Sequence, residues 1–276
     1  MNLIMPTVNR KKEVFDFIES LAQQWGLNAL KLNLYIIDQN KEEILCDLDT
    51  ISHDNIKIIY TKSADKGLSL NRNYGLDKIN RGIVSFPDDD CVYFEDTLKS
   101  VIDYFDANPT VDIVIGRIFD RKLNKNIIKN WPEHDVVVNK FNFYQLSSSI
   151  TIFCRDKPSI QFDSRLGAGS KFGSCEDPDF LYRLLKLEKK IVYTPSIDVW
   201  HPEPDVTHIS LQKVQAYACG FGAFVNKEFD LIKMYLLLAC VAKKSYQYLF
   251  LKKNYSKGYF KAFFKGLYYG LINFNR

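Results

Sequence analysis

The sequence predicts an α/β fold, in which helices flank a mostly parallel sheet and a helical appendage follows. Short apolar runs alternate with stretches of helical spacing through the first half of the chain, a pattern typical of parallel sheets covered by helices. Beyond about residue 208 the strand-like runs stop and three helix-like stretches follow. The 276 residues, 46% apolar and 25% charged, suffice for one large domain with an appendage.

Strands are expected where short apolar runs end at polar or turn residues. In chain order these runs cover residues 3–5, 32–37, 56–60, 83–86, 111–115, 147–153 and 190–193. Helices are expected over 12–24, 68–79, 98–105 and 177–187, where apolar residues recur every three or four positions. Ser69 can cap the second helix, and Pro178 suits the first position of the last one. Residues 162–175 are rich in Gly and Ser, which predicts a mobile loop.

The charge distribution divides the chain into two parts. Residues 1–206 hold 26 basic and 31 acidic residues, a net of −5, whereas residues 207–276 hold 11 and 2, a net of +9. We therefore predict a catalytic domain over 1–206, with halves 1–116 and 117–206, and a basic amphipathic helical tail over 207–276. Because the basic residues avoid the sheet region, a nucleic-acid binder is not expected.

The tail mixes aromatic residues with lysines and has no acidic residue after Asp230. The stretch 255–274 carries Lys257, Lys261 and Lys265 among its aromatic residues. This composition suits a helix at an anionic membrane surface. The apolar run over 234–242 is far shorter than the ~20 residues that span a bilayer. The alternative is that the tail packs on the catalytic domain or on a second copy, as a homodimer.

The six cysteines are scattered without C-x-x-C spacing, so neither a zinc site nor a disulfide framework is expected. The apolar run at residues 1–6 is too short for a signal peptide. Both observations favour a reducing cytoplasm, and the basic tail suits attachment to the inner face of the cell membrane.

Three consecutive aspartates, Asp88, Asp89 and Asp90, follow the apolar run at 83–86. Carboxylates this close together raise one another's pKa or hold a cation between them. Oxygen ligands favour a hard divalent ion, Mg²⁺ or Mn²⁺. Asp38 also ends a predicted strand, and the carboxyl ends of parallel strands meet at one edge of a sheet. The alternative is a solvated acidic turn or a helix N-cap.

Two helix starts carry further candidate residues. Arg72 and Asn73 would lie in the first turn after Ser69, where backbone N–H groups and a guanidinium favour a diphosphate. The alternative is a capped helix with an exposed arginine. Asp177 precedes Pro178, so it is either a functional carboxylate or the N-cap of its helix. Trp131 and Trp200 could stack on a sugar ring or simply pack in the interior.

The ordered motifs Met5–Arg10, Tyr35–Asp38, Gly67–Ser69 with Arg72 and Asn73, Phe86–Cys91 and Gly173–Asp177 together resemble a family-2-type glycosyltransferase with a GT-A fold. Each motif is weak alone, but five in the correct order are specific. The resemblance covers about residues 1–205 and is closest to enzymes of bacterial polysaccharide biosynthesis. It implies a Rossmann-like nucleotide-sugar domain and inversion at the anomeric carbon.

The resemblance also implies a role for each matching residue. Asp177 would be the catalytic base, with Glu176 beside it, and Asp88, Asp90 and His201 would hold Mn²⁺ or Mg²⁺. Trp131, Gly173, Ser174 and Trp200 would contact the acceptor, a glycan or a polyprenyl-linked glycan. Donor binding, with a UDP-sugar favoured, falls to Pro6, Thr7, Asn9, Arg10, Asp38, Lys66, Gly67, Arg72, Asn73, Asp88 and Asp89.

Two other functions would use the same carboxylates. A metal-dependent sugar nucleotidyltransferase also clusters carboxylates around a metal, but it needs an early Gly-rich phosphate loop, and residues 6–10 are a poor version of one. Release of pyrophosphate rather than nucleoside diphosphate would identify it. A non-catalytic scaffold at the membrane would instead hold a structural ion and show no metal-dependent hydrolysis of a nucleotide sugar.

Overall fold

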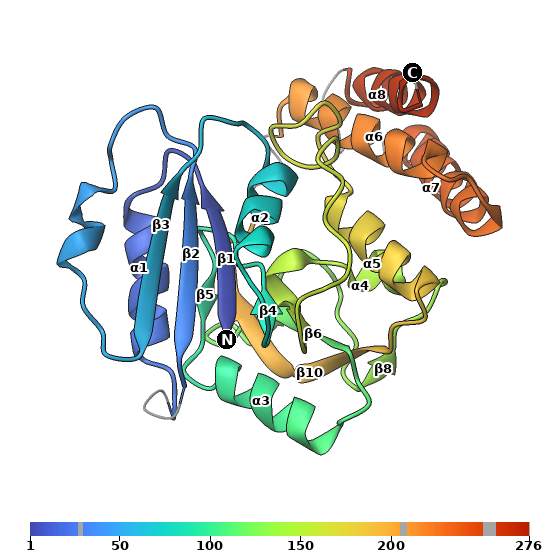
Figure 1. Ribbon diagram of the computed structural model, residues 1–276. Helices are drawn as coiled ribbons and strands as arrows, with labels where there is room; N and C mark the ends of the chain where they lie inside the picture. Colours follow the sequence, from blue (N-terminus) through green and yellow to red (C-terminus); the bar gives the residue numbers. More distant parts are fainter. Residues whose placement is uncertain (27–29, 205–208, 251–257, 276) are drawn as a thin grey trace. The chain divides into compact units, whose positions relative to one another are not determined.

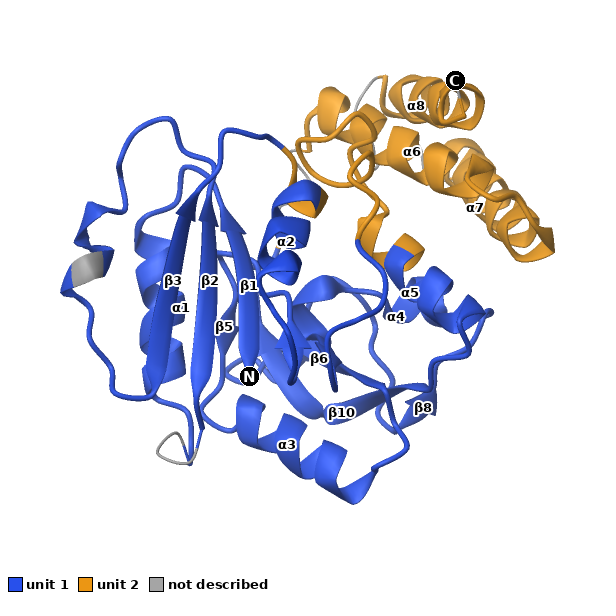
Figure 2. Cartoon of the chain, viewed as in Figure 1, with its two compact units in different colours: residues 1–66, 70–161, 180–203 blue, residues 67–69, 162–179, 204–276 orange. Residues whose placement is uncertain are grey.

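The chain forms two compact units, which Figure 2 distinguishes by colour. The structure is a computed structural model and describes residues 1–26, 30–204, 209–250 and 258–275. The first unit comprises residues 1–66, 70–161 and 180–203, and the second comprises 67–69, 162–179 and 204–276. The second unit thus joins the tail to two short segments that the sequence analysis assigned to the catalytic domain.

The first unit is built on a mixed sheet, with the order β3-β2-β1-β4-β9-β6-β10-β5 and the short strands β7 and β8 paired to β6 and β10. The expected parallel arrangement holds from β3 to β4 and again between β6 and β10, whereas β9 runs antiparallel to both of its neighbours. The strands are β1 (Asn2–Thr7), β2 (Leu32–Asp38), β3 (Ile56–Lys62), β4 (Val84–Ser85), β5 (Val92–Tyr93), β6 (Ile113–Asp120), β7 (Lys125–Asn126), β8 (Val136–Val137), β9 (Ile152–Cys154) and β10 (Ile191–Trp200).

Helices cover this sheet where the apolar spacing predicted them. Figure 1 shows β1, β2 and β3 side by side with α1 behind them. On α2, a Cβ atom at Gly75 would lie 2.4 Å from Cγ2 of Ile4, so this glycine allows the helix to approach β1 closely. The helices are α1 (Lys12–Ala22), α2 (Leu68–Asp77), α3 (Thr97–Ala107), α4 (Phe143–Leu146) and α5 (Glu176–Lys186), with 3₁₀ turns at Cys46–Thr50 and Ser149–Thr151.

The register of the first three strands brings their polar last residues together. Thr7 at the end of β1 pairs with Asp38 on β2, and Asp38 pairs with Lys62 on β3. Neighbouring strands lie about 4.8 Å apart, so the three side chains follow one another along the edge of the sheet. The parallel register therefore creates the polar edge that the sequence predicted.

The strand β10 is longer than the sequence predicted. The expected run stopped at residue 193, but β10 continues to Trp200 through an irregularity in its pairing with β6 between Tyr193 and Asp198. Pro195 falls inside this irregularity, where a strand tolerates a missing N–H donor. On β6, a Cβ atom at Gly116 would lie 2.4 Å from the carbonyl oxygen of Ile197, so only glycine fits there.

Two other expected strands are shorter than predicted. The run at 83–86 pairs only through Val84–Ser85, and the run at 147–153 becomes a 3₁₀ turn followed by β9. Serines at 147–149 explain the second difference, because their hydroxyls compete for backbone hydrogen bonds. The helix α5 begins at Glu176, so Asp177 lies inside the first turn rather than at the N-cap.

The second unit contains the three predicted tail helices, α6 (Leu211–Asn226), α7 (Leu231–Phe250) and α8 (Tyr259–Asn273). Glycines let α6 and α8 cross in close contact. A Cβ atom at Gly266 would lie 2.2 Å from the carbonyl oxygen of Gln215, and one at Gly270 would lie 2.1 Å from that of Cys219. Among the described residues, none of the helices combines the length and apolarity needed to cross a bilayer.

The segment 162–175 is anchored in the second unit and is not the loose loop that its Gly and Ser content suggested. Leu166 and Phe172 are fully buried in a cluster with Ala223 of α6 and Phe274. The N–H group of Leu68 donates to the carbonyl oxygen of Ala168 over 2.9 Å. The Ser69 hydroxyl donates to the carbonyl oxygen of Leu166 over 2.6 Å, so it holds this segment instead of capping α2.

Candidate functional site

The three aspartates that follow β4 are held by cations and hydroxyl groups, and Asp89 and Asp90 share Arg10. Asp88 accepts a hydrogen bond from Nη2 of Arg72 over 2.8 Å. Asp89 accepts from the hydroxyl of Thr7 over 2.8 Å and from Nη1 of Arg10 over 3.0 Å. Oδ2 of Asp90 pairs with Nη1 of Arg10. Arg10, which follows β1, and Arg72 on α2 therefore offset the repulsion among the carboxylates, and this does not fit a solvated acidic turn.

Burial and neighbouring charges set the protonation of Asp89. Burial raises the pKa of Asp89 to about 6, and the charges of Asp88 and Asp90 contribute, although Thr7 and Arg10 oppose the shift. The side chain lies between β1 and the aspartate loop. Asp89 therefore ties the loop to the end of β1, and the loop presents its two neighbours.

Asp90 and His201 are paired by a direct contact. Nε2 of His201 lies 3.3 Å from Oδ1 of Asp90, while Nδ1 lies 2.7 Å from the carbonyl oxygen of Pro202. Burial alone would raise the pKa of Asp90, but His201 and Arg10 outweigh it and lower that pKa to about 2. Burial disfavours the imidazolium, but Asp90 outweighs it and raises the pKa of His201 above its usual value.

Asp88, Asp90 and His201 can each offer one ligand atom, and these atoms lie within 4.8 Å of one another. Two carboxylates and one imidazole are a donor set that suits Mn²⁺, and Mg²⁺ accepts the same oxygens. All three side chains are half-buried, so a bound ion would keep positions open for a substrate oxygen. The residues present therefore fit the divalent ion that the sequence predicted.

Asp38 is fully buried and binds four donors. Its Oδ1 accepts from the N–H group and the side-chain amide of Asn40, over 2.7 and 2.6 Å. Its Oδ2 accepts from the Tyr60 hydroxyl over 2.7 Å and from Nζ of Lys62 over 3.0 Å. Burial would raise the pKa of Asp38, but these donors outweigh it and lower the pKa. A carboxylate has about four acceptor positions, so the four donors occupy Asp38, and any ligand of this carboxylate would have to displace one of them.

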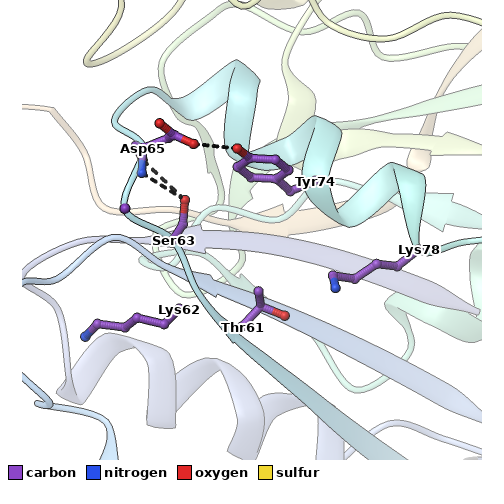
Figure 3. A pocket seen from close by; sticks show the side chains of 7 residues that line it. Thr61, Lys62, Ser63, Asp65, Tyr74 and Lys78 are labelled. Atoms are coloured by element: carbon purple, nitrogen blue, oxygen red, sulfur yellow. Dashed lines mark hydrogen bonds between the residues drawn. The ribbon is translucent and has the colours of Figure 1, made fainter.

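A depression of about 230 Å³ adjoins this cluster at the end of β3 (Figure 3). The Tyr74 hydroxyl donates to the side chain of Asp65, and the N–H group of Asp65 donates to the hydroxyl of Ser63 over 3.3 Å, so α2 and the loop after β3 hold its wall in place. Lys62 lines the depression and also binds Asp38. Its lining is Thr61, Lys62, Ser63, Ala64, Asp65, Tyr74 and Lys78.

Arg72 lies deeper than the sequence suggested. Its side chain is fully buried, and Nη2 donates to Asp88 over 2.8 Å and to the Ser149 hydroxyl over 2.7 Å. A guanidinium in this position orients Asp88 and partly neutralises the negative charge of the aspartate loop. The burial of Arg72 contradicts the alternative of an exposed arginine, and its contact with Asp88 supports a positioning role.

The remaining predicted donor residues occupy the same strand ends or the start of α2. Pro6 is buried in β1 beside Ile37. Asn9 adopts a φ of 59°, which asparagine tolerates, and its N–H group donates to the side chain of Asn40. Asn73 is buried, Lys66 is exposed, and Gly67 has a φ of 128° that favours glycine.

The start of α5 belongs to the second unit and carries three acidic residues, Glu176, Asp177 and Asp179. Asp179 is buried and accepts from Nζ of Lys227 over 2.9 Å. Gly167 lies against Glu176, because a Cβ atom there would be 3.2 Å from the carboxyl carbon of that residue. Asp177 is half-buried in the same turn, where the positive end of the helix favours a carboxylate.

The predicted acceptor residues differ in burial and in the groups that they contact. Trp131 is buried, its ring stacks on Tyr193 at 6.0 Å, and its Nε1 donates to the carbonyl oxygen of Ile127. This placement corrects the expected sugar contact, because the ring belongs to the interior. Trp200 is half-buried and donates to Asp120 over 3.3 Å. Gly173 and Ser174 pack on α6, where the Ser174 hydroxyl donates to the carbonyl oxygen of Tyr217.

Sequence analysis missed four residues around these sites: Tyr60, Lys62, Ser149 and Lys227. A weak signal existed for Lys62, because it lies two residues beyond the strand predicted at 56–60, and parallel pairing places it beside Asp38. Nothing in the sequence pairs Ser149 with Arg72 or Lys227 with Asp179, since 77 and 48 residues separate their members.

Solved structures share this fold. Staphylococcus aureus TarS residues 1–349 match with a TM-score of 0.58 and 18% identity over 83% of this chain and 66% of that chain. The same TarS region in complex with UDP matches with a TM-score of 0.62 and 17% identity, over 94% and 73% of the chains, and it has also been solved with UDP-GlcNAc. The Pyrobaculum calidifontis mannosyltransferase PcManGT, in complex with GDP-Man and Mn²⁺, matches at 0.59 and 13% identity over 99% and 86%.

A curated relative matches by sequence. The minor teichoic acid biosynthesis protein GgaB of Bacillus subtilis (strain 168) is 33% identical over 121 residues, which are 43% of this chain. The chain spans 13% of the length of that relative.

The family comparison covers most of the first unit and reaches the first residue of α5. The family described as "Glycosyl transferase family 2" matches residues 2–176, from the first strand through the aspartate loop to Glu176. The match leaves the nucleotidyltransferase and scaffold interpretations without support. The chain belongs to glycosyltransferase family 2.

Proposed function

We propose that this protein is an inverting glycosyltransferase that moves a sugar from a nucleotide-diphosphate donor to a hydroxyl of a lipid-linked surface glycan. One observation carries the proposal: in a family-2 chain, Asp88, Asp90 and His201 meet with ligand atoms within 4.8 Å of one another. The similarity to GgaB, a teichoic acid biosynthesis protein, supports a surface polysaccharide as the product.

The donor would bind along the polar edge of the first unit. A UDP-sugar is favoured, in line with the UDP and UDP-GlcNAc complexes of the structural relative TarS. Lys62 and Tyr60 are the donors that a nucleoside would displace from Asp38, and Lys62 also lines the depression beside β3. Arg10, which is only half-buried, can leave Asp90 for a phosphate oxygen without leaving a charge in a dry site.

Asp88, Asp90 and His201 would hold Mn²⁺ or Mg²⁺, and the structural relative PcManGT was solved in complex with Mn²⁺. When bound, such an ion supplies positive charge beside the diphosphate leaving group. Arg72 and Ser149 keep Asp88 in place, and the carbonyl oxygen of Pro202 orients the His201 ring. The protein thus fixes the ligands before the substrate arrives, which lowers the cost of reorganisation during transfer.

Asp177 is proposed as the base. The acceptor hydroxyl would attack the anomeric carbon from the face opposite the phosphate, the carbon–oxygen bond to the diphosphate would break, and Asp177 would take the hydroxyl proton. Attack from the opposite face inverts the configuration. Asp177 is half-buried in the first turn of α5, whereas Asp179 of the same turn is buried and binds Lys227.

The test is the substitution Asp177→Asn. It removes the proton acceptor but keeps the size of the side chain, so transfer should fall by about 10²–10⁴-fold while donor binding stays within about twofold. Transfer is measured with a radiolabelled nucleotide sugar and donor binding by calorimetry. The matched control is Glu176→Gln, one residue earlier in the same turn, which should retain most of the activity.

Equal losses of transfer and donor binding in Asp177→Asn would contradict the assignment of the base. NMR of the first product checks inversion, because a retained anomeric configuration would exclude direct displacement. We place the enzyme at the cytoplasmic face of the membrane, where nucleotide sugars and polyprenyl-linked acceptors are both accessible.

A further inference from the structure

The outward faces of α7 and α8 carry large apolar side chains and lysines, and neither helix contains an acidic residue. We propose that these faces dock the protein on an anionic lipid bilayer. The proposal deepens the proposed function, since it supplies the surface on which a lipid-linked acceptor would lie. We call this surface the tail face; its members are Leu231, Tyr235, Leu238, Tyr246 and Leu249 on α7, and Lys261, Phe264, Lys265, Tyr268 and Ile272 on α8.

The helix α7 is apolar on its outer side. Among its 20 residues only Lys233 is buried, and its Nζ group lies 4.6 Å from the ring centre of Phe224 on α6. Leu231, Leu238 and Leu249 are 76, 61 and 66% exposed, and their spacing of seven and eleven residues places them in one stripe. A helix that faces water carries polar residues in such a stripe, so this one fits an apolar partner.

The helix α8 combines lysines with aromatic residues on its outer side. Its inner side packs on α6 through Gly266 and Gly270. Its outer residues recur at intervals of three and four, from Lys261 through Phe264, Lys265 and Tyr268 to Ile272. Aromatic rings and lysine stems bury their apolar parts at a bilayer interface and keep their polar ends among the headgroups.

The two helices are joined, so their outer sides act together. The Lys244 ammonium of α7 donates to the Tyr259 hydroxyl of α8 over 2.7 Å. The ring of Tyr248 meets that of Phe260 edge-on, with centroids 5.1 Å apart. Both contacts lie inside the second unit and lock the C-terminal half of α7 to the start of α8.

The charge of the tail favours a bilayer over a second copy of the chain. Residues 231–275 contain lysines but no Asp or Glu, so two copies meeting through this face would bring like charges together. Anionic headgroups complement the same lysines, and each basic residue near such a surface strengthens binding about fivefold. Since none of the described helices is long and apolar enough to cross a bilayer, the tail would lie on its surface.

The experiment is vesicle sedimentation with the full chain. One set of vesicles is pure phosphatidylcholine, and in the other a third of the lipid is phosphatidylglycerol. We expect binding to the anionic vesicles only, and weaker binding as salt is added. The double variant Lys261→Gln with Lys265→Gln should lower the partition coefficient about 30-fold, and Leu238→Gln about tenfold.

Matched controls come from the first unit. Leu123 is 64% exposed against 61% for Leu238, so Leu123→Gln removes an equally exposed leucine. Lys122→Gln with Lys140→Gln removes two exposed lysines and the same net charge. Both controls should bind anionic vesicles like the wild type, and far-UV circular dichroism checks that every variant is folded.

Three results would overturn docking: equal binding to neutral vesicles, equal losses in the controls, or the absence of vesicle binding together with a dimer in light scattering that Leu238→Gln dissociates. The last result would assign the tail face to a second copy. The assay does not require sugar transfer, so Asp177→Asn should still bind vesicles. The tail-face variants should still transfer sugar to a short water-soluble acceptor, and this separates a failure of docking from a failure of the proposed function.

Discussion

At the scale of single residues, the partners of Asp90 keep this carboxylate ionised. It is half-buried, it pairs with Arg10 and His201, and its pKa is lowered to about 2 by those partners despite its burial. A carboxylate that stays ionised over the whole physiological range is a ready ligand for a cation. Asp89, which holds the loop to β1, differs from it because burial dominates there and its pKa rises to about 6.

Substitution of Asp90 tests whether this carboxylate is a ligand for a cation. Asp90→Ala should weaken Mn²⁺ binding by at least ~100-fold, since loss of a ligand should exceed the 10–100-fold effect of losing an outer-shell partner. If Mn²⁺ strengthens donor binding in the wild type, as we propose, Asp90→Ala should abolish that increase. Calorimetric titration with Mn²⁺, with and without UDP, measures both effects.

The control for Asp90 is Asp103→Ala, which removes an exposed carboxylate on α3 that pairs with Lys99. It should bind Mn²⁺ like the wild type. An unchanged Mn²⁺ affinity in Asp90→Ala would show that the metal, if it binds, uses other ligands.

At the scale of secondary-structure elements, the extension of β10 makes the site possible. The strand pairs with β6 on both sides of its irregularity, and its last residue, Trp200, pairs with Val92 just after the aspartate loop. His201 follows directly and reaches Asp90. Without this extension, the histidine would have no fixed position relative to the aspartates. Gly116 permits it, because β10 passes within 2.4 Å of the position where a Cβ atom would be.

The substitution Gly116→Ala should therefore disturb the site without altering any of its residues. A methyl group at this position meets the backbone of Ile197, so β10 must shift and carry His201 with it. We expect Mn²⁺ affinity to fall by roughly tenfold, in the range that loss of an outer-shell contact produces. Calorimetry measures the affinity, and urea unfolding measures the accompanying loss of stability.

The control for Gly116 is Val114→Ala on the same strand. Val114 is fully buried, so its truncation costs stability through a cavity but leaves the approach of β10 unchanged. Val114→Ala should destabilise the fold and keep the Mn²⁺ affinity. A loss of Mn²⁺ affinity in both variants would attribute the effect to general destabilisation.

At the scale of the whole molecule, a network of ion pairs connects separate segments of the second unit. Lys227 follows α6 and binds Asp163, at 2.8 Å, and Asp179 of α5, at 2.9 Å. Arg165 also binds Asp163, at 2.7 Å. Burial opposes ionisation of Asp163, but Arg165 and Lys227 outweigh it and hold the pKa of Asp163 well below its usual value. These ion pairs join the segment 162–175, the start of α5 and the tail.

This ionisation should make stability depend on pH. The pKa of Asp163 is lower in the folded chain than the value of about 3.9 in an unfolded one, so its stabilisation is complete above about pH 4 and disappears as the pH falls through the folded value. Asp163→Asn should lower the free energy of unfolding by about 2 kcal/mol at pH 7. The difference from the wild type should shrink as the pH falls from about 5 to about 2.

Urea unfolding followed by circular dichroism at several pH values measures this dependence. The control Asp103→Asn removes an exposed pair and should change the stability by less than about 1 kcal/mol at every pH. A difference between Asp163→Asn and the wild type that stays constant with pH would rule out Asp163 as the titrating group.

The sequence could predict the residues whose position depends on local pattern. Alternating apolar runs and helical spacing predicted the strands β1 to β4, and the parallel register then placed Thr7, Asp38 and Lys62 in one row. Strand ends were recognisable because polar residues follow apolar runs, as they do at Asp88. The number of helices in the tail also followed from spacing, because the three helix-like stretches expected beyond about residue 208 are α6, α7 and α8.

The sequence alone therefore determined the family, the order of the elements and the carboxylates at the strand ends. Each of these follows from local periodicity and short motifs. The resemblance predicted that His201 and Asp90 share a metal site. Only the tertiary structure decided which path of β10 brings them together, that Arg72 is buried behind Asp88 and that Trp131 belongs to the interior. These contacts join residues that are distant in the chain, and they depend on an irregularity in β10 and on the packing of side chains. Local sequence patterns do not predict such contacts, because the contacts form only when the strands have paired and the side chains around them have packed.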